Sequence, residues 1–288
     1  MPKAQKGKKK AAPSRPDPCL LAMPTRGKSS EAVKDTGLGQ TSPEPSSEAE
    51  RPGQNALGQP DKTSNYIVMI KLDGTRNPTI TRLLSLPPWL TLDKVHEVLQ
   101  IVFGWARCHM HQFEINLITE EELAGGWPAP PVMYLQLDPE YMSDDLQDDY
   151  KIEIESEYTL ADIYEKPEWK NRVSIGYEYD LGDGWMHTFS LLGRATPGTN
   201  AQLGAPNDIR VICLDGHGHG AAEDSGGPGG WEAVKEAFKH PRKAESKELV
   251  DWYKTQCYNG SRKGLDPHDF DVMDLNDRLE AFQPKPPA

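Results

Sequence analysis

The strongest constraint on the fold is a pair of alternating segments on either side of residues 180–184. In 173–179 and in 185–191, aromatic or aliphatic residues recur at every second position, which is the period at which side chains share one face of a β-strand. Between these segments, Asp-Leu-Gly-Asp-Gly supplies residues that favour a turn. The pattern predicts a β-hairpin with Tyr177 and Tyr179 on one face and Trp185 and His187 across the turn.

Alternating and helical patterns divide the rest of the chain. Alternation predicts further strands at residues 66–72, 79–86, 111–117 and 209–214. After the second strand, apolar residues at helical spacing predict a helix, with Thr91 as its cap and Gly104 at its end. A short helical turn is expected at 159–164, and longer helices are expected at 231–238, 246–254 and 271–282. Strands first and helices last predict an α+β fold: an antiparallel or mixed sheet with one helix packed after the second strand and a helical C-terminal third.

Composition sets the domain boundaries. The chain has 32 basic and 44 acidic residues and a formal net charge of −12. Residues 1–64 are poor in aromatic and β-branched residues, so they are predicted to form a disordered leader. This leader is net basic, and its cluster at Lys3 to Lys10 is either a nuclear localisation signal, a weak anion tether or a solubilising tail. We expect a single acidic domain over 65–282, with a long solvated connection at 119–150, and a tail over 283–288.

Several classes of protein are disfavoured. No apolar run approaches the roughly 20 residues that span a bilayer, so we expect no membrane association and an intracellular protein, cytoplasmic or nuclear. The chain has 4 cysteines but no Cys-x-x-Cys pair, and it lacks the common nucleotide-binding and hydrolase motifs. The acidic charge of the domain argues against nucleic-acid binding through the folded body, which leaves weak contact through the basic leader.

A glycine-rich segment, residues 213–227, gathers imidazoles, carboxylates and a thiol. Two His-x-His pairs occur in the chain, one within this segment, and such a pair on an extended strand points both rings to one side, which suits chelation of a cation such as zinc. A divalent metal such as zinc is therefore a candidate cofactor, although Gly-His repeats also occur in plain flexible loops. The candidate metal ligands are His109, His111, His187, His217 and His219.

Two functions follow from these residues. The first is a binding module with an acidic, aromatic-lined surface that receives a basic or polar partner, either a protein or a polar ligand. The alternative is a metal-assisted hydrolase or nuclease-like enzyme in which Asp183 or Glu223 acts as the base. A purely structural interpretation also stands, in which the hairpin aspartates build the turn and the histidine packs among aromatic rings. The predicted binding surface comprises Tyr177, Tyr179, Asp180, Asp183, Trp185, His187, Glu223 and Asp224.

Several of these strings together resemble the plasmid pRiA4b ORF-three-like domain, a family also found in passengers of mobile elements. The clearest matches are YEYDLGDGWMH at 177–187 and EDSGG at 223–227, and the resemblance covers roughly residues 65 to 282. It implies a compact α+β domain and no defined activity. The loop of this chain departs from the family pattern at four positions, where the pattern has cysteines or prolines. If relatives have a cysteine-rich metal site, this chain is expected to have lost it or rebuilt it from histidines. These positions are Gly220, Ala221, Ala222 and Ser225.

Overall fold

The computed structural model describes residues 64–125, 127, 129–136, 151–196, 198 and 211–285. The predicted leader up to residue 63, the acidic run at 144–149, the start of the strand predicted at 209–214 and the last three residues of the predicted tail lie outside the described residues. Among the residues that are described, no helix combines the length and the apolar character needed to cross a membrane.

An eight-stranded mixed sheet forms the centre of the fold, with the strand order β5-β4-β3-β6-β7-β1-β2-β8. Neighbouring strands are antiparallel except for the parallel pair β4 and β5. The strands are β1 (Tyr66–Leu72), β2 (Ile80–Leu86), β3 (His111–Leu117), β4 (Met133–Gln136), β5 (Ile152–Ile154), β6 (Val173–Tyr179), β7 (Trp185–Arg194) and β8 (Ile212–His217). The predicted α+β fold is confirmed, and of the two predicted kinds of sheet, antiparallel or mixed, the structure has the mixed one.

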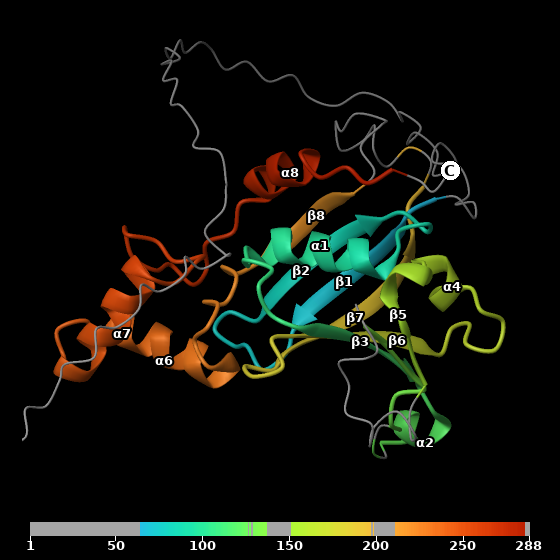
Figure 1. Ribbon diagram of the computed structural model, residues 1–288, viewed down its shortest axis with the longest axis horizontal. Helices are drawn as coiled ribbons and strands as arrows, with labels where there is room; N and C mark the ends of the chain where they lie inside the picture. Colours follow the sequence, from blue (N-terminus) through green and yellow to red (C-terminus); the bar gives the residue numbers. More distant parts are fainter. Residues whose placement is uncertain are drawn as a thin grey trace, which may run out of the picture. The chain divides into compact units, whose positions relative to one another are not determined.

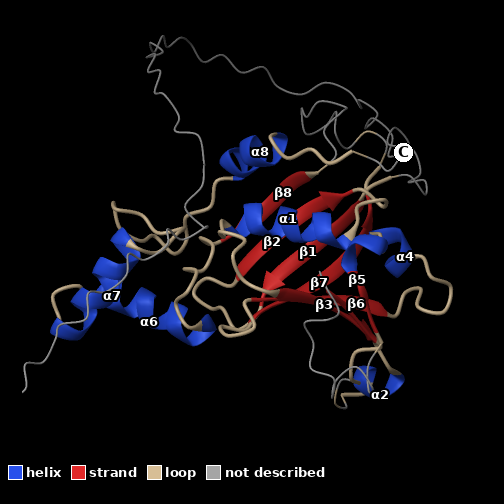
Figure 2. Cartoon of the chain, viewed as in Figure 1, coloured by secondary structure: helices blue, strands red, loops and turns tan. Residues whose placement is uncertain are grey.

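Helices cover one face and one end of this sheet. Figures 1 and 2 show α1 (Leu92–Phe103) running across β1 and β2, with α6 (Gly227–Lys239) and α7 (Ala244–Thr255) beyond one end of the sheet. Helix α8 (Val272–Glu280) lies beside β8, where the Asn276 amide exchanges two 2.8 Å hydrogen bonds with the backbone of Cys213. The helix after the second strand and the helical C-terminal third are therefore confirmed. The shorter elements are α2 (Glu120–Leu123), η3 (Glu155–Glu157) and α4 (Leu160–Tyr164).

The hairpin has the predicted register. Tyr177 lies opposite His187, and Tyr179 lies opposite Trp185. Helix α1 also begins and ends where the sequence predicted, but the Thr91 side chain does not cap the backbone and instead donates its hydroxyl hydrogen to Asp93. The hydrophobic core lies between α1 and the sheet face that carries Val68, Ile70 and the other alternate residues of β1.

The expectation of a purely solvated connection over 119–150 is wrong in its described part. Strand β4 lies within it, and Met133 and Leu135 are buried opposite Ile115 and Phe113 of β3. Four residues flanked by glycine and proline are too few to show alternation above the loop composition, so only pairing with β3 reveals the strand. Strand β5 extends the same edge and was also absent from the predicted elements.

Candidate functional site

Three loops meet at one end of the sheet and bring most of the singled-out residues together. The segment after α1 is joined to the loop between β8 and α6 by a 2.9 Å hydrogen bond from Trp105 Nε1 to the carbonyl oxygen of Ala221. The same segment is joined to the hairpin turn by a 2.8 Å hydrogen bond from the backbone N–H of Asp180 to the Met110 carbonyl oxygen. These bonds hold the turn, the loop and the end of α1 in one place.

Glu223 is the buried centre of this junction, with 1% of its surface exposed. Its carboxylate accepts a 2.6 Å hydrogen bond from the Tyr179 hydroxyl and bonds of 2.9 and 3.1 Å from the Ala106 N–H. Burial raises the pKa of Glu223 from its ordinary value, and these hydrogen bonds oppose the rise. The carboxylate is therefore committed to holding the loop against α1, which leaves it poorly placed to accept a substrate proton.

The two aspartates of the hairpin hold backbone groups. Asp180 has a left-handed backbone, and its Oδ1 accepts hydrogen bonds from the N–H groups of Gly182 at 3.1 Å and Asp183 at 3.3 Å. Asp183 Oδ2 instead accepts a 2.9 Å hydrogen bond from the N–H of Gly226, the residue that caps α6. A carboxylate at a helix N-terminus is stabilising, since it complements the helix dipole. Asp183 thus links the hairpin to α6.

His109 lies between two carboxylates. Its Nε2 is 2.9 Å from Asp224 Oδ1, and its Nδ1 is 3.6 Å from Asp180 Oδ2. One donor atom from each of these three residues lies within 4.8 Å of the other two, and the same is true of Cys108, His109 and Glu223. His109 belongs to both groups. Of the predicted metal ligands in the described residues, it is the one that lies close to other side chains that could bind a metal.

The aromatic side chains predicted to line the surface are inside the protein. Tyr177, Tyr179, Trp185 and His187 are all fully buried, because their strand face packs against α1 and the segment that follows it. Their burial corrects the expectation that they line an open surface. Burial also raises the pKa of Tyr179 and lowers the pKa of His187 to about 4, so both groups are neutral at neutral pH.

The other predicted histidine ligands are dispersed. His111 stacks on His96 with ring centroids 3.6 Å apart and pairs with buried Glu155 at 2.9 Å. The rings of His217 and His219 have different neighbours, His268 and Trp231 respectively. Over the residues with described positions, no group of three donors includes His111, His187, His217 or His219.

The two His-x-His pairs separate for a physical reason. Strand β8 ends at His217, and Gly218 has a left-handed backbone with φ of 80°, so the extended geometry required for chelation is lost. His109 precedes β3 and faces the hairpin turn, whereas His111 is within β3 and faces α1. The two imidazoles of each pair therefore have different partners in the structure.

An acidic pocket of about 380 Å³ lies beside Asp224. Its other lining residues are Ser225 of the same loop and four residues of α7, namely Glu245, Glu248, Leu249 and Trp252. Sequence reasoning missed the four α7 residues, although their spacing carries a signal: they follow the i, i+3, i+4, i+7 pattern of one helix face. That face combines two carboxylates with two apolar side chains.

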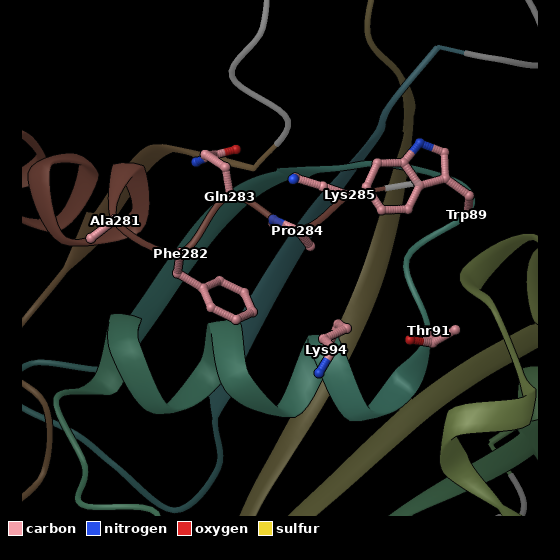
Figure 3. Close-up of a pocket in the computed structure, with 8 residues that line it drawn as sticks. All are labelled: Trp89, Thr91, Lys94, Ala281, Phe282, Gln283, Pro284 and Lys285. Atoms are coloured by element: carbon pink, nitrogen blue, oxygen red, sulfur yellow. The ribbon is translucent and has the colours of Figure 1, made fainter. Parts of the chain in front are cut away.

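A second pocket of about 380 Å³ lies between the start of α1 and the segment after α8. Figure 3 shows the Trp89 indole and the Phe282 ring at opposite ends of this pocket, and Lys94 and Lys285 are also among its lining residues. The lining holds lysines and no acidic residue, in contrast to the pocket beside Asp224, and none of the predicted site residues contributes to it.

The fold and the site define an α+β domain in which a hairpin turn and a glycine-rich acidic loop are fastened to the end of α1. The chain belongs to the family described as Plasmid pRiA4b ORF-3-like protein, which matches residues 64–274. The chain is 25% identical to the uncharacterised protein y4hQ of Sinorhizobium fredii over 198 residues, which cover 69% of this chain and 86% of that protein.

A solved structure supports the fold alone. It is the crystal structure of a protein of unknown function from Methanosarcina mazei Go1, which has a TM-score of 0.50 and 24% sequence identity, with 73% of this chain and 96% of that chain covered. The first relative is uncharacterised and the second is of unknown function, so neither indicates an activity for this chain.

Proposed function

We propose that this domain is a binding module that accepts a lysine or arginine side chain of a partner protein in the acidic pocket beside Asp224. One observation carries the proposal: three carboxylates, of Asp224, Glu245 and Glu248, line the same concave site as the Trp252 indole and the Leu249 side chain.

The chemistry of the lining fits a cation with an apolar stem. Asp224, Glu245 and Glu248 are exposed, so their carboxylates stay hydrated and attract an ammonium or guanidinium group over several ångströms. The face of an indole attracts the same cation, by about 0.5 to 1 kcal/mol at an exposed site. Leu249 and Trp252 are half-buried and offer apolar surface to the methylene groups of the stem.

The net charge favours this partner over a nucleic acid. The whole chain carries −12, and the leader within it is net basic, so the folded domain is more acidic than that value. A strongly negative domain steers basic partners toward it and repels phosphate groups.

A metal-assisted hydrolase is less well supported as the function. The two proposed bases, Asp183 and Glu223, both accept hydrogen bonds that hold the loops together. A general base needs an accessible lone pair directed at the substrate proton. The geometry therefore supports these two side chains better as structural acceptors than as catalytic groups.

Binding of a fluorescent lysine-rich peptide, followed by anisotropy in the presence of EDTA, tests the proposal. The double variant Glu245→Gln and Glu248→Gln should weaken binding about tenfold, since two exposed ion pairs contribute up to about 1 kcal/mol each. The matched control is Glu120→Gln with Glu121→Gln, two exposed glutamates on α2, which Figure 1 shows well separated from α7.

The control separates a pocket from a general charge effect, because both double variants change the net charge equally. An equal loss of affinity in the two variants, or undiminished binding by the α7 variant, would show that the pocket does not receive the peptide. Binding that weakens with added salt in both the wild type and the control variant is a further expected result.

A further inference from the structure

We propose that His109, Asp180 and Asp224 form a binding site for a divalent metal ion of the zinc class at the edge of the acidic pocket. Imidazole nitrogen and carboxylate oxygen are both ordinary zinc ligands, and three protein ligands with one position open to water are typical of an accessible zinc centre. The inference goes beyond peptide binding, because Asp180 and His109 are not part of the pocket lining.

The spacing of the donor atoms fits one ion. Zinc–nitrogen and zinc–oxygen bonds of about 2.0 to 2.2 Å place two ligands of the same ion roughly 3 to 3.5 Å apart. His109 Nε2 and Asp224 Oδ1 are 2.9 Å apart, and one donor atom of each of the three residues lies within 4.8 Å of the others. The Asp224 side chain is 57% exposed, so a rotation of this side chain can bring the set closer without disturbing the core.

The state of the imidazole provides a second observation. His109 Nε2 is inaccessible to solvent and makes no hydrogen bond in the described structure, even though a carboxylate oxygen lies 2.9 Å away. The contact therefore has the distance of a hydrogen bond but not its direction. A cation between the nitrogen and the oxygen would satisfy both atoms.

Asp180 is held ready for the same role by its turn. Its Oδ1 takes the two hydrogen bonds from Gly182 and Asp183, and its Oδ2 lies 3.6 Å from Nδ1 of His109. One donor atom of Asp180 lies within 4.8 Å of a donor atom of both other residues, so a small movement brings its carboxylate to the ion. Hydrogen bonds that fix a carboxylate reduce the entropy lost when it binds a metal. Three negative side chains, of Asp180, Asp224 and Glu223, surround the single imidazole, and a divalent cation would offset their mutual repulsion.

Isothermal titration of the untagged, EDTA-treated full chain with zinc chloride tests the site, together with the visible spectrum of the cobalt(II) form. We expect one ion per chain. His109→Gln, Asp180→Asn and Asp224→Asn should each weaken binding at least tenfold. Both asparagine variants suit their positions, because asparagine tolerates the left-handed backbone that Asp180 and Asp224 adopt. Circular dichroism of each variant checks that the fold is retained.

The matched control is Glu236→Gln with His240→Gln, which removes an exposed histidine–carboxylate pair 3.3 Å apart at the C-terminal end of α6. This variant should bind zinc like the wild type. Absence of stoichiometric binding would overturn the proposal and leave His109 paired only with the two carboxylates. Loss of binding in Cys108→Ser with full binding in Asp180→Asn would also overturn it, since the ion would then belong to Cys108, His109 and Glu223.

The two proposals fail separately. Glu245→Gln with Glu248→Gln should impair peptide binding in EDTA and leave zinc binding by the three ligands intact. Asp180→Asn should do the reverse.

Discussion

His187→Gln tests whether the hairpin histidine is a neutral core residue. The imidazole is fully buried and has edge-to-face contacts with Phe103 and Trp105, at centroid distances of 4.7 and 5.3 Å. Its Nδ1 lies 3.2 Å from the carbonyl oxygen of Tyr177, to which it donates a hydrogen bond. Glutamine keeps a polar end but loses both ring contacts and introduces a flexible amide into the core.

The expected loss at pH 7 is about 2 to 3 kcal/mol of unfolding free energy. Each edge-to-face contact contributes roughly 0.5 to 1.5 kcal/mol, and an amide group left without partners in the core costs roughly 1 to 3 kcal/mol. The glutamine amide still has the Tyr177 carbonyl oxygen as an acceptor within the core, so it is not wholly without partners and the lower part of the summed range is the expectation.

The pH dependence is the sharper readout. Burial lowers the pKa of His187 from 6.5 to about 4 in the folded protein. Between these values the unfolded chain binds more protons than the folded protein, so the stabilisation from a neutral imidazole is present above pH 6.5 and is lost as the pH falls. Between pH 7 and pH 5, protonation linked to His187 should lower the unfolding free energy of the wild type by about 2 kcal/mol. The glutamine variant has no imidazole at this position, so it should not show this decrease.

Urea denaturation of both proteins at pH 7 and pH 5, followed by circular dichroism, measures the two effects. The stability difference should be largest at pH 7 and about 2 kcal/mol smaller at pH 5, and the other histidines cancel in the comparison. His240→Gln, at the exposed position that follows α6, should show neither effect. A stability difference that is the same at both pH values, or a variant as stable as the wild type at pH 7, would refute the neutral buried imidazole.

Two further predictions concern the junction between the hairpin and α6. Gly227→Ala should destabilise the protein by about 2 to 5 kcal/mol in thermal melts, because the added Cβ would lie 2.2 Å from the Asp183 carbonyl oxygen and the backbone there is left-handed. Gly229→Ala is the control: its Cβ would meet nothing within 4 Å, so in the same measurement it should stabilise the helix by about 0.5 to 1 kcal/mol. Asp183→Ala should cost about 1 to 2 kcal/mol through loss of the Gly226 hydrogen bond, and Asp183→Asn should cost less because it keeps an acceptor oxygen. Equal denaturation midpoints for the alanine and asparagine variants would contradict that role.

Local patterns were sufficient for the main elements. The period of two in residues 173–191 specified the hairpin and its register, because a shift by one residue would turn Tyr177 and Trp185 to the other face. The helical period from Leu92 specified α1 in the same way. Strand β4 could not be found by this reasoning, because its four residues are held by β3 rather than by their own sequence.

The site depended on contacts that no local pattern records. Composition and motif spacing identified the hairpin turn and the acidic loop, but they did not show that Tyr177 and Trp185 face inward, which follows from α1 packing over that face. The two His-x-His pairs looked equivalent in sequence, and only the chain direction around Gly218 and the packing of His111 on His96 separated their rings. His109 meets Asp180 and Asp224 because three loops distant in sequence are fastened at the end of one helix. Periodicity therefore determined which residues share a face, while long-range packing decided which faces are buried and which side chains meet.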